Sequence, residues 1–265
     1  MLCGEAQLAY DRVHLSGYFS GTSREQLALT TEQAYQAANI QYRLNCWVEQ
    51  INREQQLVVT RQGGQFYYDE LVLATGSYAF VPPIPGNEQP HCLVYRTLQD
   101  LDAIAQSAAV SKVGVVIGGG LLGLEAANAL KLLGLEAHVV EFAPQLMPVQ
   151  LDKDGGELLR SKIQQLGVSV HTDKATSSIS AGTEQRLQLN FADGSVLQTD
   201  LIVFSAGIRP QDQPGKDAGL ELGARGGIVI NNQCQTSDAD IYAIGECALY
   251  QGQLFGLVAP GYQMA

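Results

Sequence analysis

The order of apolar and polar positions predicts alternating strands and helices in the second half of the chain. Residues 113–117 form a continuous apolar run, which is typical of a strand buried on both faces. A glycine-rich turn follows, and residues 124–133 then place apolar side chains at helical spacing. Residues 137–140 are again mostly apolar and are followed by Glu141. This order of strand, helix and strand predicts a βαβ unit with parallel strands.

The two halves of the chain repeat one local pattern 131 positions apart. Residues 69–76 and residues 200–207 each form an apolar strand that runs into a turn of small residues. Strand-like runs with turn signals precede both; they lie at 46–51, 56–61 and 65–68 in the first half and at 187–191 and 195–199 in the second. Each half is therefore predicted to carry a small antiparallel meander ahead of its last buried strand.

Two further stretches, residues 22–38 and 98–109, have the pattern of amphipathic packing helices. We expect the second of them to carry the crossover between the halves. If the halves are true repeats, the glycine motif of the first half would fall before residue 1, and Glu141 corresponds to Tyr10. We therefore expect a fragment that begins at the end of the first half's second strand and lacks its first βα unit.

The composition argues against several classes of function. The chain has 16 Lys and Arg against 27 Asp and Glu, a net charge of −11, whereas a nucleic-acid or anionic-membrane binder needs a basic face. No apolar run approaches the about 18 residues of a membrane span and no signal peptide opens the chain, so we expect a soluble, cytoplasmic protein. The five cysteines form no C-x-x-C pair and no ligand cluster, and we predict no metal site.

The turn after residue 117 has the glycine spacing of a dinucleotide site. Gly118 suits a tight turn, Gly120 lets the backbone approach a pyrophosphate, and Gly123 lets the helix pack closely on the strand. The N-terminus of the helix offers unpaired N–H groups to the phosphates. Glu141 would accept hydrogen bonds from the adenine-ribose hydroxyls and repel a 2′-phosphate, which favours NAD over NADP. The alternative is that the glycines serve only helix–strand packing and Glu141 is a solvated strand end.

Glu125 lies on the first turn of the same helix, two residues after Gly123. An acidic residue at this position can simply stabilise the helix dipole, or it can lie near the nicotinamide or a flavin. The predicted NAD-binding residues are Gly118, Gly120, Leu121, Leu122, Gly123, Glu125, Glu141 and Gly207.

Strings along almost the whole chain resemble one family, the two-nucleotide flavoprotein reductases. The matching strings lie at 9–16, 74–77, 118–126, 141–144, 205–210, 225–231, 241–246 and 255–265. Within the family the chain is most similar to the FAD and NAD(P)H module of assimilatory nitrite reductase large subunits, and closely similar to the electron-transfer subunit of assimilatory nitrate reductase. The resemblance implies an α/β fold class with two tandem Rossmann-like three-layer nucleotide-binding domains, each with a small antiparallel meander, the first truncated at its N-terminus.

The resemblance also implies the chemistry. FAD would occupy the first half and NADH the second, and electrons would leave through iron–sulfur and sirohaem centres of other domains or subunits. No catalytic side chain is expected, because hydride transfer from nicotinamide to flavin belongs to the cofactors. The resemblance places FAD beside Arg12, Ala74, Thr75, Gly76, Gly245 and Glu246. Without the resemblance, Arg12 could be an ordinary surface arginine, and the hydroxyls of Thr75 and Ser77 could simply cap a turn.

The chain departs from the family pattern at several positions. Glu246 stands where most of the family has Asp. Gly17 stands where some relatives have a Lys that pairs with the acid corresponding to Glu125, so we do not expect that ion pair. The chain has no C-x-x-x-x-C redox pair, which argues against a disulfide-reductase mechanism. The adenine-ribose acid of the FAD site would fall near Gly4 and Glu5.

Together these inferences predict a discontinuous FAD-type domain of residues 1–109 and 237–265, and an NAD-binding domain of residues 110–236. The predicted function is an NAD(P)H-dependent flavoprotein oxidoreductase that passes electrons from NADH via FAD toward nitrite or nitrate reduction. A stand-alone reductase of a ferredoxin or rubredoxin, and a catalytically inactive NAD-binding fragment, remain alternatives. Without the first βα unit we expect weak or absent FAD. We also expect an exposed sheet centre, which predicts local disorder near the N-terminus or pairing with a second chain, as in a homodimer.

Overall fold

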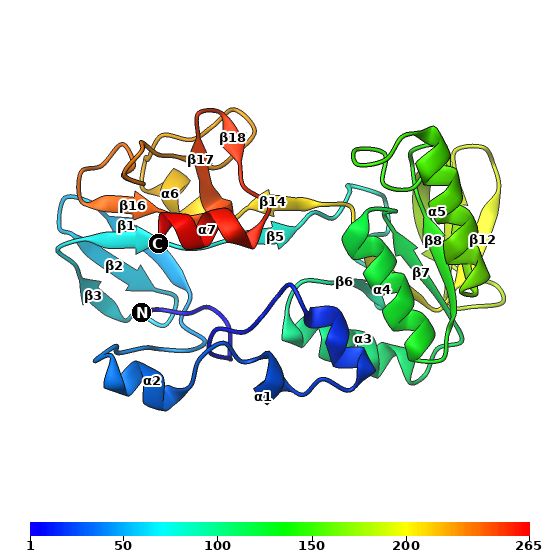
Figure 1. Cartoon of the computed structure of the whole chain (residues 1–265), viewed down its shortest axis with the longest axis horizontal. Coiled ribbons are helices and arrows are strands. Elements are labelled where there is room, and N and C mark those ends of the chain that lie inside the picture. The colour runs from blue at the N-terminus through cyan, green and yellow to red at the C-terminus, as the bar shows by residue number, and fades with distance from the viewer. The chain divides into compact units, whose positions relative to one another are not determined.

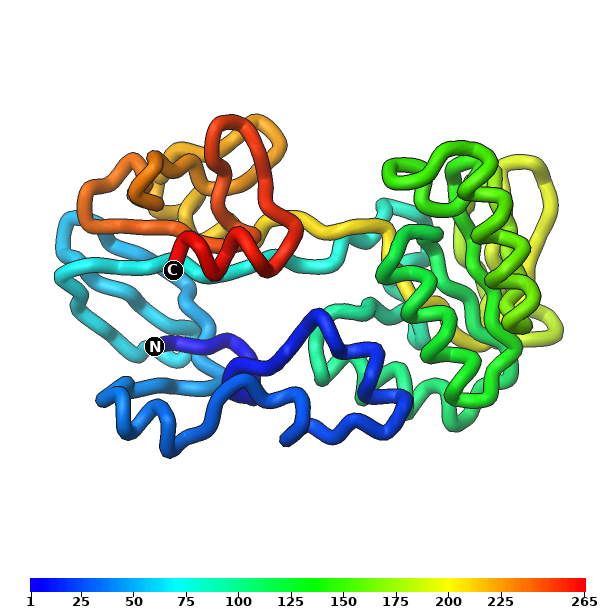
Figure 2. The backbone as a smooth tube through the Cα atoms, in the orientation of Figure 1, coloured from blue at the N-terminus to red at the C-terminus, as the bar shows by residue number.

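The computed structural model describes all residues, 1–265. They divide into two units, each built from separate segments of the chain (Figure 1). Unit 1 comprises Met1–Val13, Arg24–Tyr78 and Ile208–Ala265, and unit 2 comprises His14–Ser23 and Ala79–Gly207. Residues 79–109 thus belong to unit 2 and residues 208–236 to unit 1, so the units depart from the domain limits expected at 109 and 237. The return of the chain to unit 1 after residue 207 can be followed in Figure 2.

Unit 2 is built on a five-stranded parallel sheet. In spatial order its strands are β6 (Cys92–Val94), β13 (Leu201–Phe204), β7 (Val113–Ile117), β8 (Glu136–Val140) and β9 (Val168–His171). Val115, Val116 and Ile202, in the central strands, are completely buried. Burial on both faces explains why these strands are continuous apolar runs in the sequence.

Helices connect the parallel strands of unit 2. Helix α3 (Leu98–Ala108) links β6 to β7, α4 (Leu121–Leu132) links β7 to β8, and α5 (Lys153–Gln165) links β8 to β9. The predicted βαβ unit is confirmed, although α4 begins three residues earlier than the apolar spacing indicates. The expected role of α3 as the crossover between the halves is wrong, because this helix connects two strands of one sheet. A 3₁₀ helix, η1 (Leu15–Ser20), also packs on α4.

Each unit contains an antiparallel meander, as the internal repeat predicts. Unit 1 contains β1 (Val48–Asn52), β2 (Leu57–Thr60) and β3 (Gln65–Tyr67). Unit 2 contains β10 (Thr176–Ala181), β11 (Leu187–Phe191) and β12 (Val196–Thr199). The next strand along the chain, β4 (Leu71–Leu73) in unit 1 and β13 in unit 2, enters a parallel pairing. Leu187, Leu189 and Phe191 of β11 pack against the parallel sheet of unit 2.

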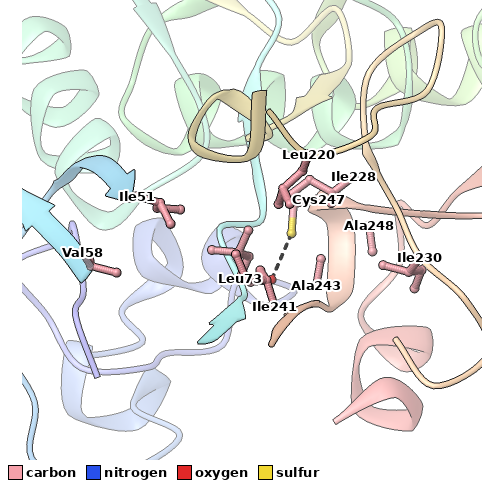
Figure 3. Close-up of a cluster of buried hydrophobic side chains, with 10 residues drawn as sticks. All are labelled: Ile51, Val58, Leu73, Leu220, Ile228, Ile230, Ile241, Ala243, Cys247 and Ala248. Atoms are coloured by element: carbon pink, nitrogen blue, oxygen red, sulfur yellow. Dashed lines mark hydrogen bonds between the residues drawn. The ribbon is translucent and has the colours of Figure 1, made fainter. Parts of the chain in front are cut away.

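The core of unit 1 brings together segments from both ends of the chain. Strand β4 pairs in parallel with β16 (Ile241–Ala243). Figure 3 shows Leu73 packed among side chains of the meander and of the last segments, and the Sγ of Cys247 donates a hydrogen bond of 3.3 Å to the Leu73 carbonyl. The remaining strands are β5 (Ser77–Ala79) paired with β14 (Ile208–Pro210), and β15 (Ile228–Val229), β17 (Ala248–Tyr250) and β18 (Gln253–Leu254) in one small sheet.

The helices of unit 1 are short. A single helix over residues 22–38 is not formed; α1 (Arg24–Leu27) and α2 (Glu32–Ala37) replace it. The chain breaks between them because Thr31 takes an extended conformation and caps α2 by accepting a hydrogen bond from the N–H of Ala34. The other helices of this unit are α6 (Gln213–Asp217), η2 (Gly245–Cys247) and α7 (Val258–Met264). No helix in either unit has the length and apolarity needed to cross a membrane.

Candidate functional site

The turn between β7 and α4 requires glycine at two positions. Gly118 has φ = +123°, and a Cβ built there would lie 2.2 Å from the carbonyl oxygen of Ser205, which follows the neighbouring strand β13. A Cβ on Gly123 would lie 1.9 Å from the carbonyl oxygen of Gly118. Both contacts are with backbone and cannot be relieved by a side-chain rotation. These glycines therefore allow α4 to begin directly against the end of β7.

The third glycine leaves the start of α4 open. Gly120 is the N-cap of α4, no side chain caps the helix, and a Cβ at Gly120 would meet nothing within 4 Å. The first N–H groups of a helix have no partner within the helix and carry partial positive charge. Leu121, the first helical residue, is 64% exposed, and Leu122 is half-buried. This uncapped, accessible N-terminus fits the pyrophosphate of a dinucleotide.

Glu141 follows β8 and is anchored to the same turn. Its Oε2 accepts a hydrogen bond of 2.6 Å from the N–H of Gly119, and its Oε1 accepts one of 2.7 Å from the N–H of Ala143. An ionised carboxylate has about four acceptor positions, so both oxygens can still accept a bond from a hydroxyl. The acid predicted to bind the ribose is thus held at the glycine turn.

The predicted NAD-binding residues all lie in unit 2, and three of them follow the carboxyl ends of neighbouring strands. Gly118 follows β7, Glu141 follows β8, and Gly207, with φ = +104°, follows β13. The carboxyl ends of parallel strands are where open α/β sheets bind ligands. The structure therefore brings together the residues that the sequence pattern selected.

Glu125 lies on α4 and is half-buried. Burial raises the pKa of Glu125, and the nearby charge of His14 opposes this shift. Tyr95, just after β6, is 1% exposed, and the Glu125 charge adds to the burial that raises the pKa of the Tyr95 phenol. Glu125 is therefore more than an exposed partner of the helix dipole, because it interacts with groups from two other segments of unit 2.

The residues predicted to bind FAD lie in unit 1 and, apart from Arg12, in the turns that follow β4 and β16. Gly76 and Gly245 both have positive φ, +68° and +74°, in the turns that follow Ala74 and Ile244. The hydroxyl of Ser77 donates a bond of 2.9 Å to Oε2 of Glu246. This contact joins residues from opposite ends of the chain at the carboxyl ends of two parallel strands.

The hydroxyls of Thr75 and Ser77, in the turn after β4, do more than cap that turn. Thr75 donates a bond of 2.5 Å to the carbonyl of Gln211, whose N–H in turn donates to the carbonyl of Gly76 at 2.8 Å. Ser77 contacts Glu246 as described. These long-range bonds fix the turn after β4 against the segments that return from unit 2 along the chain.

Arg12 is held by an acid and a tyrosine near the N-terminus. Its guanidinium forms an ion pair with Glu5 and donates a bond of 2.7 Å to the Tyr10 hydroxyl, which donates 2.6 Å to the other Glu5 oxygen. The Arg12 guanidinium also stacks over the Tyr10 ring. Arg12 is therefore not an isolated surface arginine, because Glu5 and Tyr10 both hold its guanidinium.

Comparison with known proteins identifies the family of the chain. Residues 1–265 match the family described as pyridine nucleotide-disulphide oxidoreductase. The chain belongs to this family. It is 60% identical over 265 residues to the nitrite reductase [NAD(P)H] large subunit of Klebsiella oxytoca, covering 100% of this chain and 28% of that protein. It is 54% identical over 266 residues to the nitrite reductase (NADH) large subunit of Escherichia coli K12, covering 100% of this chain and 31% of the relative. The chain thus spans about a third of these relatives.

A solved member of the family has the same fold. The ferredoxin reductase of Rhodopseudomonas palustris superposes with a TM-score of 0.87 at 30% identity, covering 97% of this chain and 64% of that one. The predicted fold class, an α/β protein of the two-nucleotide reductase type, is confirmed by this likeness and by the family match.

The five cysteines of this chain are all free thiols, at positions 3, 46, 92, 234 and 247. Burial raises the pKa of Cys92 to about 11, which disfavours the reactive thiolate.

Sequence reasoning missed two members of the candidate sites, Ser77 as a partner of Glu246, and Tyr95. Ser77 looks like an ordinary turn residue in the sequence, and only its position directly after the turn at Gly76 could have drawn attention to it. Tyr95 follows an apolar run, where a tyrosine is expected simply as a packing residue.

Proposed function

We propose that the chain is an NADH-dependent flavoprotein reductase module that passes electrons toward nitrite or nitrate reduction. The observation that carries the proposal is the open N-terminus of α4 beside the anchored carboxylate of Glu141. Family membership and the high identity to nitrite reductase large subunits support it. Since those relatives are about three times longer, the acceptor side of the reaction is the part that needs experiment.

In this proposal unit 2 holds NADH. The N–H groups at the start of α4, with Leu121 and Leu122, bind the pyrophosphate, and Gly120 leaves the space for its approach. Glu141 accepts the ribose hydroxyls and repels a 2′-phosphate. Gly207 and Glu125 lie toward the nicotinamide, and Glu125 orients that end of the cofactor.

Unit 1 holds FAD in the same proposal. The turn Ala74–Gly76 and the turn at Gly245 bring backbone close to the cofactor, and Glu246, oriented by Ser77, accepts ribityl hydroxyls. Arg12 balances the charge of the FAD phosphates. When bound, the flavin accepts hydride from the nicotinamide and supplies single electrons, so the side chains bind and orient and none transfers a proton.

A calorimetric titration tests the NADH site directly. We expect the chain to bind NADH, to bind NADPH at least about tenfold more weakly, and to lose most of this preference in Glu141→Gln, because the neutral amide no longer repels a phosphate. Glu157→Gln is the matched control, since this glutamate on α5 is 73% exposed. Equal affinity for the two cofactors in the unmodified chain would contradict the assignment of Glu141.

The visible spectrum of the purified protein tests the flavin site. One FAD per chain, bleached by NADH without oxygen, is the result expected of a working reductase module, and it would contradict the weak or absent FAD binding expected without the first βα unit. A colourless protein that still binds NADH would favour the alternative of an NAD-binding module without catalysis. Sedimentation of the same sample tests for a homodimer.

The electron acceptor separates the main proposal from its closest competitor. The likeness to a ferredoxin reductase supports a stand-alone reductase as the second candidate. Electron transfer from NADH through this chain to nitrite, seen only when iron–sulfur and sirohaem domains or subunits are supplied, supports the nitrite pathway. Turnover with a small ferredoxin or rubredoxin and none with nitrite-reducing partners supports the competitor.

A further inference from the structure

The hydroxyl of Tyr95 is a buried polar group that the fold leaves without a partner. Tyr95 is 1% exposed, and no protein atom forms a hydrogen bond with its hydroxyl. Buried hydroxyls are nearly always bonded, and an unpaired one is costly, whereas phenylalanine fills the same space without that cost. A tyrosine at this position therefore indicates a role for the hydroxyl beyond packing.

The surroundings of Tyr95 are built by segments of unit 2 only. The ring of Phe19 in η1 lies 6.5 Å from the Tyr95 ring. The neighbouring Tyr18 donates a bond of 2.9 Å to Asp102, which ties η1 to α3, and η1 also packs on α4. In Figure 1 the blue η1 segment lies beside α3. Tyr95 is thus enclosed under η1 next to the helix that carries Glu125.

Glu125 is the acceptor that these surroundings offer. It is half-buried on α4, and its charge acts on the Tyr95 phenol. The other group that acts on Glu125 is His14, just before η1, whereas Asp102 on α3 already accepts the Tyr18 hydroxyl. The Tyr95 phenol stays protonated and can donate, and the glutamate side chain has three rotatable bonds with which to meet it.

We propose that the Tyr95 hydroxyl donates a hydrogen bond to the Glu125 carboxylate and so positions Glu125 at the nicotinamide end of the cofactor site. Tyr95 is a positioning residue in this scheme, since it acts through Glu125. The placement of Glu125 near nicotinamide rests on the proposed function, whereas the bond between the two side chains does not.

Carboxyl NMR of Glu125 in the chain without ligand tests the bond. A hydrogen bond to an ionised carboxylate stabilises the charged form, so Tyr95→Phe should raise the proton affinity of Glu125 about tenfold. Tyr18→Phe is the matched control, because it removes a hydroxyl of the same type that bonds Asp102 instead. An unchanged Glu125 titration in folded Tyr95→Phe would overturn the proposal.

A second measurement does not depend on the folding of Tyr95→Phe. In the unmodified chain the Tyr95 hydroxyl proton should exchange with solvent slowly, and Glu125→Ala should speed this exchange at least about tenfold, which the isotope shift of the Tyr95 ring carbon reports. Equal exchange in both proteins would overturn the bond.

Calorimetric NADH affinity against pH then tests the role of the pair. We expect its midpoint to follow the Glu125 titration and to move in Tyr95→Phe. If the unmodified chain does not bind NADH, the proposed function fails while the two NMR results still decide the bond. If NADH binds with no dependence on Glu125, the positioning role fails alone.

Discussion

The carboxylate of Glu141 accepts a hydrogen bond from the backbone N–H of Gly119 across 22 positions of sequence, at 2.6 Å. The same side chain accepts the N–H of Ala143. The residue that would select the cofactor therefore also fixes the shape of the turn that would bind its phosphates. Selectivity and local stability depend on one carboxylate.

This double role predicts that Glu141→Ala destabilises the chain even without cofactor. Two partly buried N–H groups lose their acceptor, so the free energy of unfolding should fall by about 1–3 kcal/mol. Glu141→Gln keeps one carbonyl acceptor and should lose less. Denaturant unfolding of both variants measures the difference, with Glu157→Ala as a control that stays within about 0.5 kcal/mol. Equal stability of Glu141→Ala and the unmodified chain would show that the two bonds do not shape the turn.

The glycine turn predicts that substitution at Gly123 mainly lowers stability, whereas substitution at Gly120 mainly lowers NADH affinity. Gly123→Ala places a methyl group 1.9 Å from a carbonyl oxygen and should destabilise the fold by about 2 kcal/mol or more. Gly120→Ala meets open space, so it should cost no more than about 1 kcal/mol as an N-cap change while weakening NADH about tenfold. Thermal melting and calorimetry on the two variants separate the effects. The reverse order of stabilities would contradict the geometry of the turn.

His138 on β8 and His171 on β9 lead us to expect that the folded chain becomes less stable in mild acid. Nδ1 of His138 lies 3.0 Å from Nε2 of His171, and the rings are stacked. Burial lowers the pKa of both; Lys174 and Arg160 lower that of His171 further, while Glu136 opposes the shift at His138.

Because the folded state binds fewer protons than the unfolded state, the stabilisation is complete above the ordinary pKa of 6.5 and is lost as pH falls below it. We expect a loss of roughly 1 kcal/mol between pH 7 and pH 5 that is absent when both histidines are replaced by Gln. Denaturant unfolding at several pH values checks this. The same slope in the double variant would assign the effect to other groups.

Replacing an N-cap threonine by alanine should lower the free energy of unfolding by different amounts at Thr97 and Thr31. Thr97 and Asp100 form a capping box at the start of α3, with bonds of 3.1 and 2.7 Å. Thr97→Ala should therefore cost about 1 kcal/mol or slightly more. Thr31 makes a single exposed bond to α2, a helix with no buried residue, and Thr31→Ala should cost less. Unfolding curves of the two variants give the comparison, and a larger loss at Thr31 would reverse the argument.

Local pattern predicted the central βαβ unit closely. Strand β7 has the predicted limits, because five consecutive apolar residues flanked by a turn have few other structures open to them. The single helix expected over residues 22–38 was wrong, because Thr31 is extended and its side chain caps a new helix, α2. The position of η1 could not be read from the repeat, because η1 packs on α4 in unit 2 while the segments on either side of it belong to unit 1.

Some residues of the candidate sites could likewise be predicted from local sequence, and others could not. The glycine turn and Glu141 could be selected from spacing, since glycine at a tight turn and an acid at a strand end are local requirements. The bond between Ser77 and Glu246 joins residues 169 positions apart, and no spacing rule connects them.

What the sequence by itself determined is therefore the set of local structures: the buried strands, the meanders, the helix after the glycine turn and the residues suited to a dinucleotide. These follow from side-chain periodicity and backbone sterics within a few residues. The tertiary structure alone decided which segments pair in parallel, that Glu141 is anchored to Gly119, and that Tyr95 is buried without a partner beside Glu125. Such relationships depend on how distant segments pack to bury apolar surface, and packing is a property of the whole fold.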